Sequence, residues 1–209
     1  ALTEELNAFD TEGVSAILSA SPYYNRPAQE GIYQHYAALS AASPLPLIVY
    51  NVPGRTSSNI SAQTTIRLAK DFGNIVAIKE ASGNLDQITE ILLERPADFQ
   101  VLSGDDNLTF AMMALGAEGV ISVSGQGVPE VFSAMANHMK EGRWAQARAA
   151  HLSIYDLTNQ LFEEGNPVGI KALLETRGIT QATVRLPLVE ATDNLKNALA
   201  ASLEILNLS

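Results

Sequence analysis

Short apolar runs, separated by polar or glycine-rich turns, recur along the first two thirds of the chain. Five of them have the length of strands: residues 14–18, 47–50, 75–78, 101–102 and 119–123. Uninterrupted apolar residues are typical of strands that are buried on both faces, as in a parallel sheet covered by helices. The pattern therefore predicts five strands of such a sheet.

Segments with helical periodicity lie between these runs, at residues 28–42, 61–72, 84–95, 107–117 and 129–142. The alternation of strand and helix predicts an α/β fold, either a doubly wound sheet or a (β/α)8 TIM barrel. Because a barrel closes with eight units, a barrel here would contain only about the last five β/α units. Three units would then be missing before Ala1.

The pattern changes at about Arg143. Residues 144–165, 166–178 and 192–206 are predicted to be three helices with no strand between them. We therefore expect two domains, a partial (β/α)8 catalytic barrel at residues 1–142 and a C-terminal three-helix domain at residues 143–209.

Composition narrows the class of partner. The chain has 209 residues, of which 46% are apolar, and a formal net charge of -10. The negative charge leaves no basic stripe for nucleic acid or an anionic membrane, so small molecules are the expected partners. The absence of cysteine excludes disulfides and thiolate ligands and fits the cytoplasm.

No apolar run of about eighteen residues and no basic-then-apolar leader is present, so we expect neither a membrane span nor an export signal. The chain opens with "ALTEELNAFDTEG" and no initiator Met, which indicates a truncated polypeptide that begins inside or at the edge of a helix.

Polar sequences follow the predicted strands: "SPYYNRP", "YNVPGRT", "KEASG", "SGDD" and "SVSGQG". In both candidate folds reactive residues gather at the carboxyl ends of the strands. Lys79 directly follows the run at 75–78, where desolvation would favour a neutral, nucleophilic amine able to form a Schiff base. The alternative is a strand-end lysine whose ammonium reaches water or pairs with Glu80.

Three further positions could complete a site around Lys79. Tyr50 ends the neighbouring run, so its hydroxyl could lie with Lys79 at the carboxyl end of the sheet and relay protons there. Alternatively, its ring could simply be buried. Arg55 lies on a Pro and Gly loop, where it could bind a carboxylate through two hydrogen bonds or remain solvated. Tyr23 and Tyr24 form an aromatic pair that suggests an interface or a stacking wall.

Metal chemistry has weaker support. Asp105 and Asp106 could be metal ligands or an acid and base pair, but "DDNLTF" also has the pattern of a helix start, which favours capping for at least one of them. The three histidines are scattered through helical segments without metal-ligand spacing. We predict no metal site and assign the histidines no chemistry.

Six motifs, "SPYYNRPAQEGIYQHY", "IVYNVPGRT", "IVAIKEASGN", "LSGDD", "GAEGVISV" and "EGNPVGIKALL", occur in this order. Together they resemble the 4-hydroxy-tetrahydrodipicolinate (dihydrodipicolinate) synthase family, within the N-acetylneuraminate lyase and class I aldolase superfamily. The resemblance runs from near Ala1 to the last helix. It implies a (β/α)8 barrel with a C-terminal helical domain, assembled as a homotetramer, a dimer of tight dimers.

The same resemblance implies a lyase that condenses pyruvate with aspartate semialdehyde in lysine and diaminopimelate biosynthesis. Lys79 would form the imine with pyruvate, so that no separate cofactor is needed. Tyr50 matches the tyrosine of the proton relay. Tyr24 matches the tyrosine that a partner subunit inserts into that relay, and Tyr23 resembles its interface neighbour.

Substrate-binding positions follow from the same motifs. Arg55 corresponds to the arginine that binds the semialdehyde carboxylate, and the backbones of Gly104 and Ile121 match positions that line the pyruvate pocket. The family's "GTTGE"-like loop, whose threonines bind the pyruvate carboxylate, is absent from this sequence. Ala1 stands where an acidic residue binds feedback lysine in inhibited members, so we expect weak or no inhibition by lysine.

Two other interpretations remain open. A related pyruvate-dependent aldolase, such as N-acetylneuraminate lyase or a keto-deoxy-sugar-acid aldolase, would share the lysine and tyrosine. The arginine in "NVPGRT" favours a short aldehyde acid over a sugar. A non-catalytic fragment that serves only as a packing module is the third possibility.

Overall fold

The computed structural model describes residues 2–8 and 10–208. They form two compact units. The first contains the described residues of Ala1–Asp105 and Ala111–Ile121, and the second contains those of Asp106–Phe110 and Ser122–Ser209. The predicted domain boundary between residues 142 and 143 stays a prediction.

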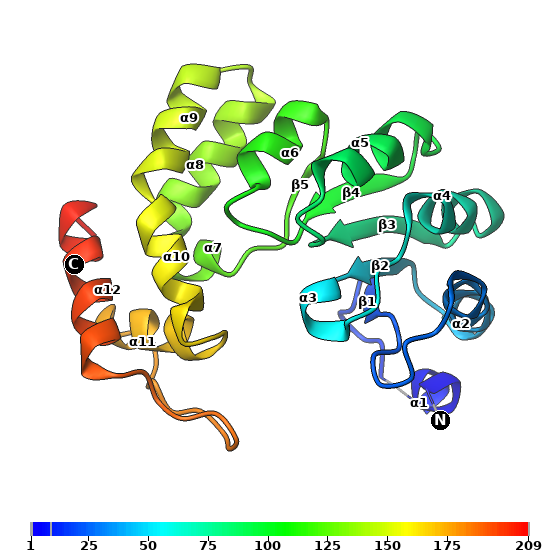
Figure 1. The fold of residues 1–209 in the computed structure, drawn as a ribbon, viewed down its shortest axis with the longest axis horizontal. Helices are drawn as coiled ribbons and strands as arrows, with labels where there is room; N and C mark the ends of the chain where they lie inside the picture. The colour runs from blue at the N-terminus through cyan, green and yellow to red at the C-terminus, as the bar shows by residue number, and fades with distance from the viewer. Residues whose placement is uncertain (1, 9, 209) are drawn as a thin grey trace. The chain divides into compact units, whose positions relative to one another are not determined.

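The first unit is built on a five-stranded sheet in the order β1-β2-β3-β4-β5, shown in Figure 1. The strands are β1 (Ile17–Ala20), β2 (Leu47–Asn51), β3 (Ile75–Glu80), β4 (Gln100–Ser103) and β5 (Gly119–Val120). Every neighbouring pair is parallel. A doubly wound sheet reverses its strand order at a switch point, whereas a barrel adds strands in sequence. The structure therefore confirms the α/β prediction and favours the barrel over the doubly wound alternative.

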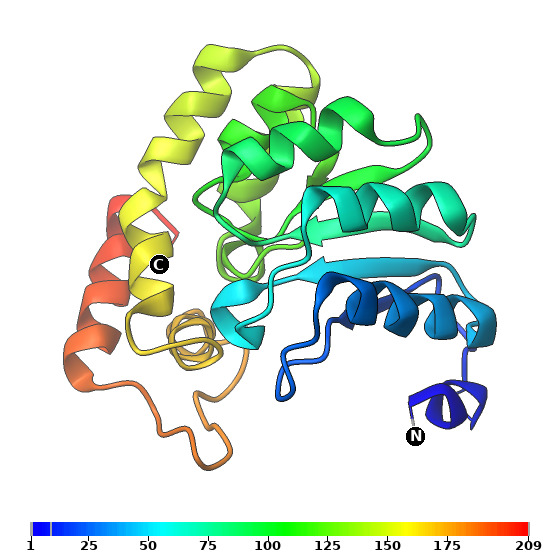
Figure 2. The same ribbon diagram turned by 45° about the vertical axis from the view of Figure 1, so that its right-hand side comes forward.

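Helices connect these strands. They are α1 (Leu2–Ala8), α2 (Gln29–Ala42), the short α3 (Pro53–Thr56), α4 (Ala62–Asp71), α5 (Leu85–Glu94) and α6 (Thr109–Leu115). Figure 2 shows α2 and α4 running alongside the sheet. Side chains fix where two of them begin: the Ser61 hydroxyl accepts the Thr64 N–H at the start of α4, and Asn84 accepts two N–H groups at the start of α5.

The two faces of the sheet differ in burial. Side chains alternate between the faces along a strand. One face contributes Val49, Ile78 and Val101 to the core, and all three are fully buried. The other face carries Tyr50 and Lys79, which are half-buried. The lysine thus lies on the more accessible face of the sheet.

The second unit is helical in its described residues after 122. Its helices are α7 (Ser124–Gly127), α8 (Pro129–Lys140), α9 (Trp144–Ser153), α10 (Tyr155–Glu163), α11 (Val168–Thr176) and α12 (Asp193–Ile205). Gly127 allows α7 and α11 to approach closely, because a Cβ there would lie 2.4 Å from Leu173 Cδ2. Arg177, which directly follows α11, donates hydrogen bonds to the Gly127 carbonyl in α7 and to the Glu130 carboxylate in α8.

Several element boundaries differ from the predictions. The strand predicted at 75–78 continues through Lys79 and Glu80, and the one predicted at 14–18 is β1, Ile17–Ala20. β5 ends at Val120 rather than at Val123. The helix predicted at 144–165 is two helices, since Ile154 adopts a turn conformation (φ -106°, ψ 4°) with its side chain buried. The short helices α3 and α7 were not predicted.

Among the described residues, no helix combines the length and the apolar character needed to cross a membrane.

Candidate active site

Lys79 and Tyr50 meet at the carboxyl end of the sheet. They are register partners on the neighbouring parallel strands β3 and β2. The Lys79 ammonium nitrogen lies 4.3 Å from the centroid of the Tyr50 ring. At this distance the ring and an ammonium attract each other, which orients the lysine toward the tyrosine. The structure thus brings together the two residues that the sequence singled out first.

Gly104 lies against the aliphatic stem of Lys79. A Cβ at Gly104 would be 3.0 Å from both Cγ and Cε of the lysine and 2.9 Å from the Cβ of Ala81. The Gly104 N–H donates to the Glu80 carbonyl, so the β3–β4 ladder continues one residue past β4. Ile121 likewise continues β5, donating its N–H to the Ser103 carbonyl at 2.9 Å. Their role in lining a pyruvate pocket stays a prediction.

Burial raises the pKa of Tyr50 above its ordinary value, and the positive charge of Arg55 acts in the opposite direction. Arg55 lies on α3, in the loop that follows β2, and its side chain is exposed. Within the described part of the chain, its guanidinium makes no hydrogen bond or ion pair. Arg55 is therefore close enough to influence Tyr50 electrostatically and open to an anionic ligand.

Tyr36, in α2, bonds to the backbone of the strands that precede the site. It is fully buried, and its hydroxyl donates to the Ser19 carbonyl at 2.7 Å. Burial raises the pKa of Tyr36 strongly, and a hydrogen bond with the backbone of Tyr50 opposes that rise. The phenol thus connects α2 to the ends of β1 and β2.

Tyr23 and Tyr24 lie in the loop after β1, with exposed fractions of 69% and 93%. Such exposure of two adjacent aromatic residues is compatible with an interface. Their function stays a prediction.

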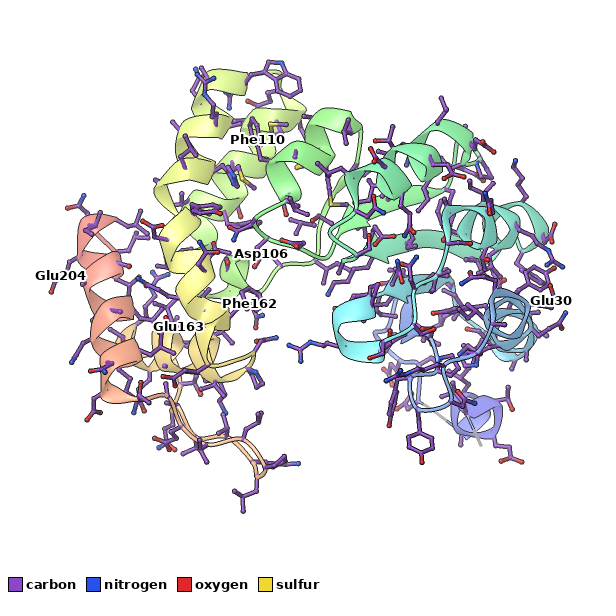
Figure 3. All side chains as sticks on the ribbon, in the orientation of Figure 1. Glu30, Asp106, Phe110, Phe162, Glu163 and Glu204 are labelled. Atoms are coloured by element: carbon purple, nitrogen blue, oxygen red, sulfur yellow. The ribbon has the colours of Figure 1, made fainter. Side chains whose placement is uncertain are left out.

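Asp106 has a capping role, as expected for one member of the aspartate pair, but the helix that it caps is α7. Its Oδ2 accepts the N–H groups of Val123 and Ser124 at 3.0 and 2.7 Å, and the residue, labelled in Figure 3, is buried. These two bonds draw Val123 away from the strand conformation predicted for it. Within the described residues no group of three or more histidine, aspartate or glutamate side chains could hold a metal ion.

The three histidines contact neighbouring aromatic rings or an arginine. His35 packs edge-on against Tyr36, and His138 accepts a hydrogen bond from Arg143. His151 stacks on Phe110, with ring centroids 5.5 Å apart. Ala1, on which the expectation about lysine inhibition depends, lies outside the described residues.

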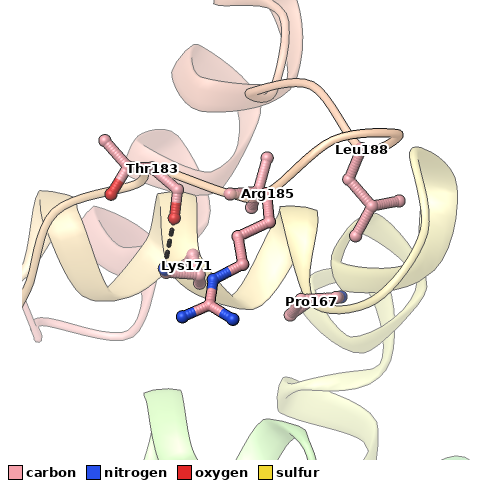
Figure 4. Close-up of a pocket in the computed structure, with 6 residues that line it drawn as sticks. Pro167, Lys171, Thr183, Arg185 and Leu188 are labelled. Carbon is pink, nitrogen blue, oxygen red and sulfur yellow. Dashed lines mark hydrogen bonds between the residues drawn. The ribbon is translucent and has the colours of Figure 1, made fainter.

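The second unit contains a cavity of about 560 Å³. Figure 4 shows the side chains that line it, and none of the predicted site residues is among them. The Lys171 ammonium donates to the Thr183 carbonyl beside it. The lining residues are Pro167, Lys171, Thr183, Val184, Arg185 and Leu188.

Two polar residues next to the site were missed as functional candidates, Asn51 and Glu80. Both are fully buried at the ends of β2 and β3. Glu80 was expected only as an ion-pair partner for Lys79, but adjacent residues of a strand point to opposite faces, so the two side chains point apart. In the sequence, a polar residue close behind an apolar run was the signal that could have identified both.

Sequential parallel strands with polar chemistry at their carboxyl edge place the chain among the (β/α)8-barrel proteins. The model of the Dihydrodipicolinate synthetase family matches residues 3–206. The chain therefore belongs to the dihydrodipicolinate synthetase family, as the six motifs predicted.

Individual relatives agree with this membership. The chain is 51% identical over 189 residues to a 4-hydroxy-tetrahydrodipicolinate synthase of Phocaeicola vulgatus, which covers 90% of this chain and 64% of that protein. The chain thus spans less than two thirds of that relative's length.

Solved structures show the same fold. Dihydrodipicolinate synthase from Thermotoga maritima superposes with a TM-score of 0.96 at 36% identity, over 99% of this chain and 71% of that one. The chloride-inhibited dihydrodipicolinate synthase from Acinetobacter baumannii, complexed with pyruvate, gives 0.93 at 37% identity, over 99% and 71%. The predicted TIM-barrel fold class is thereby confirmed.

Proposed function

We propose that the protein condenses pyruvate with L-aspartate-4-semialdehyde to give 4-hydroxy-tetrahydrodipicolinate, a step of lysine and diaminopimelate biosynthesis. The observation that carries the proposal is the placement of the Lys79 amine over the Tyr50 ring at the carboxyl end of adjacent barrel strands. Membership of the family and a relative solved with pyruvate support the choice of substrates.

Lys79 is the nucleophile of this proposal. Its neutral amine adds to the ketone carbon of pyruvate, and a proton delivered through Tyr50 lets the carbinol oxygen leave as water, so that a protonated imine remains. The imine withdraws electrons, so the pyruvate methyl group gives up a proton and becomes an enamine. The enamine carbon then attacks the aldehyde carbon of the second substrate, whose oxygen takes up a proton. The amine of that substrate next adds to the imine carbon, and Lys79 leaves as the ring closes. The covalent imine makes a separate cofactor unnecessary.

Tyr50 relays protons next to the imine. A tyrosine phenol is protonated at neutral pH, and burial raises the pKa of Tyr50 further, so its hydroxyl can donate a hydrogen bond or pass a proton on. Tyr24 of a neighbouring subunit extends this relay, with Tyr23 packing beside it. The exposure of both side chains supports an assembly of subunits, which we propose is a homotetramer.

Arg55 binds the carboxylate of the semialdehyde. Its exposed guanidinium, on a loop next to Tyr50, offers paired N–H donors that match a carboxylate. The backbones of Gly104 and Ile121 line the space for pyruvate. We place the enzyme in the cytoplasm, where pyruvate and the semialdehyde are expected.

Borohydride trapping tests the proposal. The complete gene product is incubated with pyruvate, reduced and digested, and the modified peptide is identified by mass spectrometry. We expect a reduced pyruvyl adduct on Lys79 and its loss in Lys79→Ala. Lys70→Ala, which removes an exposed lysine from the last turn of α4, is the matched control and should retain the adduct.

Addition of the second substrate completes the test. Turnover of pyruvate with aspartate semialdehyde, and not with sugar aldehydes, is the expected result. The absence of any adduct on Lys79 would overturn the assignment of the nucleophile. An adduct without turnover of the semialdehyde would leave an aldolase of another specificity as the better description.

A further inference from the structure

Glu80 is a fully buried carboxylate that directly follows Lys79 in the sequence. Three N–H groups surround it. The Asn51 side-chain amide donates to Oε1 and Oε2 at 3.1 and 3.0 Å, Gln87 donates to Oε2 at 3.1 Å, and the Ser82 backbone donates to Oε1 at 2.7 Å. Because all three partners are donors, the position requires a group that only accepts, which an ionised carboxylate does.

Asn51 connects this carboxylate to the loop that carries Arg55. The Asn51 Oδ1 accepts the N–H of Ile60 at 2.9 Å, which closes the loop of residues 52–60 at its base. The Asn51 Nδ2 also donates to Asn59 Oδ1 at 2.9 Å, besides its bonds to Glu80. The position of the loop is therefore set by an amide whose own orientation depends on the Glu80 carboxylate.

Gln87 provides a second connection between the same parts. Its side-chain amide accepts from Asn59 at 2.8 Å and donates to the carbonyl of Ile60 at 3.2 Å and to Glu80. Glu80 is thus held from the loop side and from the first turn of α5. The centre of this network, Glu80 with Asn51, is fully buried, and loss of the acceptor there leaves several donors without partners.

We propose that Glu80 is a positioning residue, which fixes the Arg55 loop relative to Lys79 and thereby sets the recognition of the second substrate's carboxylate. The inference rests on the proposed function. Glu80 does not face the reacting atoms, because adjacent side chains of β3 point to opposite faces of the sheet. It acts through Asn51 on the loop and through its own backbone on Lys79.

The proposal predicts that the two substrates respond differently to a change at Glu80. Glu80→Gln keeps the shape of the side chain but places an N–H₂ group among the N–H donors that surround the carboxylate. This change disturbs the contact with Asn51 and loosens the loop of residues 52–60. Lys79 and its strand pairing remain, so imine formation with pyruvate should persist. The KM for aspartate semialdehyde should rise about tenfold or more, while the KM for pyruvate should change by less than about twofold.

A rescue variant separates this role from a general loss of stability. In Glu80→Gln with Asn51→Asp, the amide and the carboxylate exchange places: the introduced aspartate can accept both from Ile60 N–H and from the introduced glutamine. A partial return of the KM for the semialdehyde is expected, since the contact is restored in reverse. Ile88→Val, a change in a fully buried residue of α5 outside the network, serves as the structural control and should alter neither KM.

Amide hydrogen exchange measures the loop without reference to the reaction. Peptides covering residues 52–60 should exchange faster in Glu80→Gln than in the wild type and should recover in the double variant. Equal effects on both KM values, or no recovery in the double variant, would overturn the proposal. If the wild type forms no pyruvate adduct, the proposed function fails, and unchanged exchange in the loop then separately refutes the positioning role.

Discussion

The backbone of Gly104 lies so close to Lys79 that a single added methyl group would stand 3.0 Å from both Cγ and Cε of the lysine. The same carbon would lie 2.9 Å from the Cβ of Ala81, so the lysine stem, Ala81 or the Gly104 backbone must move to admit it. The bare backbone of Gly104 therefore defines the path of the lysine stem toward Tyr50. The resemblance gave Gly104 a place in the substrate pocket, and the structure adds this contact with the proposed nucleophile.

Gly104→Ala should slow formation of the pyruvate adduct by about tenfold or more, because the displaced lysine leaves its position over Tyr50. Borohydride trapping at short times measures the rate. Gly119→Ala is the matched control, since a Cβ there meets only Leu102, at the ordinary distance of 3.9 Å. Trapping at the wild-type rate in Gly104→Ala would show that the contact has no functional effect.

Arg55→Lys should raise the KM for aspartate semialdehyde by about tenfold, because an ammonium keeps the charge but loses the paired hydrogen bonds. Arg55→Ala should raise it further, and the KM for pyruvate should stay nearly constant in both variants. Initial rates with one substrate varied at a time give the values. Arg148→Lys in α9, also an exposed arginine, should leave both unchanged. A parallel rise of both KM values would argue against a contact with the semialdehyde.

Tyr24→Phe should lower kcat while subunit assembly is retained, because the ring remains and only the relay hydroxyl is lost. Rates are compared with sedimentation profiles at equal protein concentration. Tyr23→Ala should instead weaken assembly, since it removes a large exposed ring from the proposed interface. If Tyr24→Phe retains full activity, its hydroxyl is not part of the relay.

Tyr36 makes stability dependent on alkaline pH. Burial raises its pKa, so the folded protein keeps a proton that the unfolded chain releases above about pH 10. The contribution of Tyr36 is therefore complete below that pH and decreases as the pH rises further. Tyr36→Phe, which loses the bond to Ser19, should cost about 1 kcal/mol near neutral pH, and the difference from the wild type should shrink above about pH 10. Urea unfolding at both pH values measures it, and a constant difference would contradict the assignment.

Uninterrupted apolar runs located the strands of the sheet, and helical periodicity located the longer helices, because each helix buries one face against its neighbours. These patterns gave wrong element boundaries where hydrogen bonds from side chains outside the element determine the backbone conformation. The run at 75–78 was expected to end before Lys79, yet β3 continues through Glu80, whose charge is stabilised by Asn51 and Gln87. Asn51 lies 29 residues and Gln87 seven residues from Glu80, both outside β3, so the apolar pattern of the strand cannot reveal them. In the same way Asp106, 17 residues away, draws Val123 out of its predicted strand.

The sequence could indicate that Lys79 and Tyr50 lie close together, while their function stays a prediction. Lys79 and Tyr50 end neighbouring apolar runs, and parallel strands bring their carboxyl ends to one edge. Arg55 was a candidate because it lies on a Pro and Gly loop after a strand. Gly104 and Ile121 were candidates from the family resemblance alone. No sequence pattern could show that Gly104 touches Lys79, because the contact depends on the register between β3 and β4.

The bond from Asn51 to Ile60 has a consequence for protein engineering. This bond joins the two ends of the intervening segment. Within the segment Val52, Thr56 and Ser58 are buried, whereas Gly54 and Arg55 are exposed. These two exposed positions can therefore be varied while the buried ones hold the loop. A library confined to Gly54 and Arg55 would vary the loop that we propose meets the acceptor aldehyde, and it would leave Lys79 unchanged. The same barrel could then be directed toward aldehydes of different length and charge.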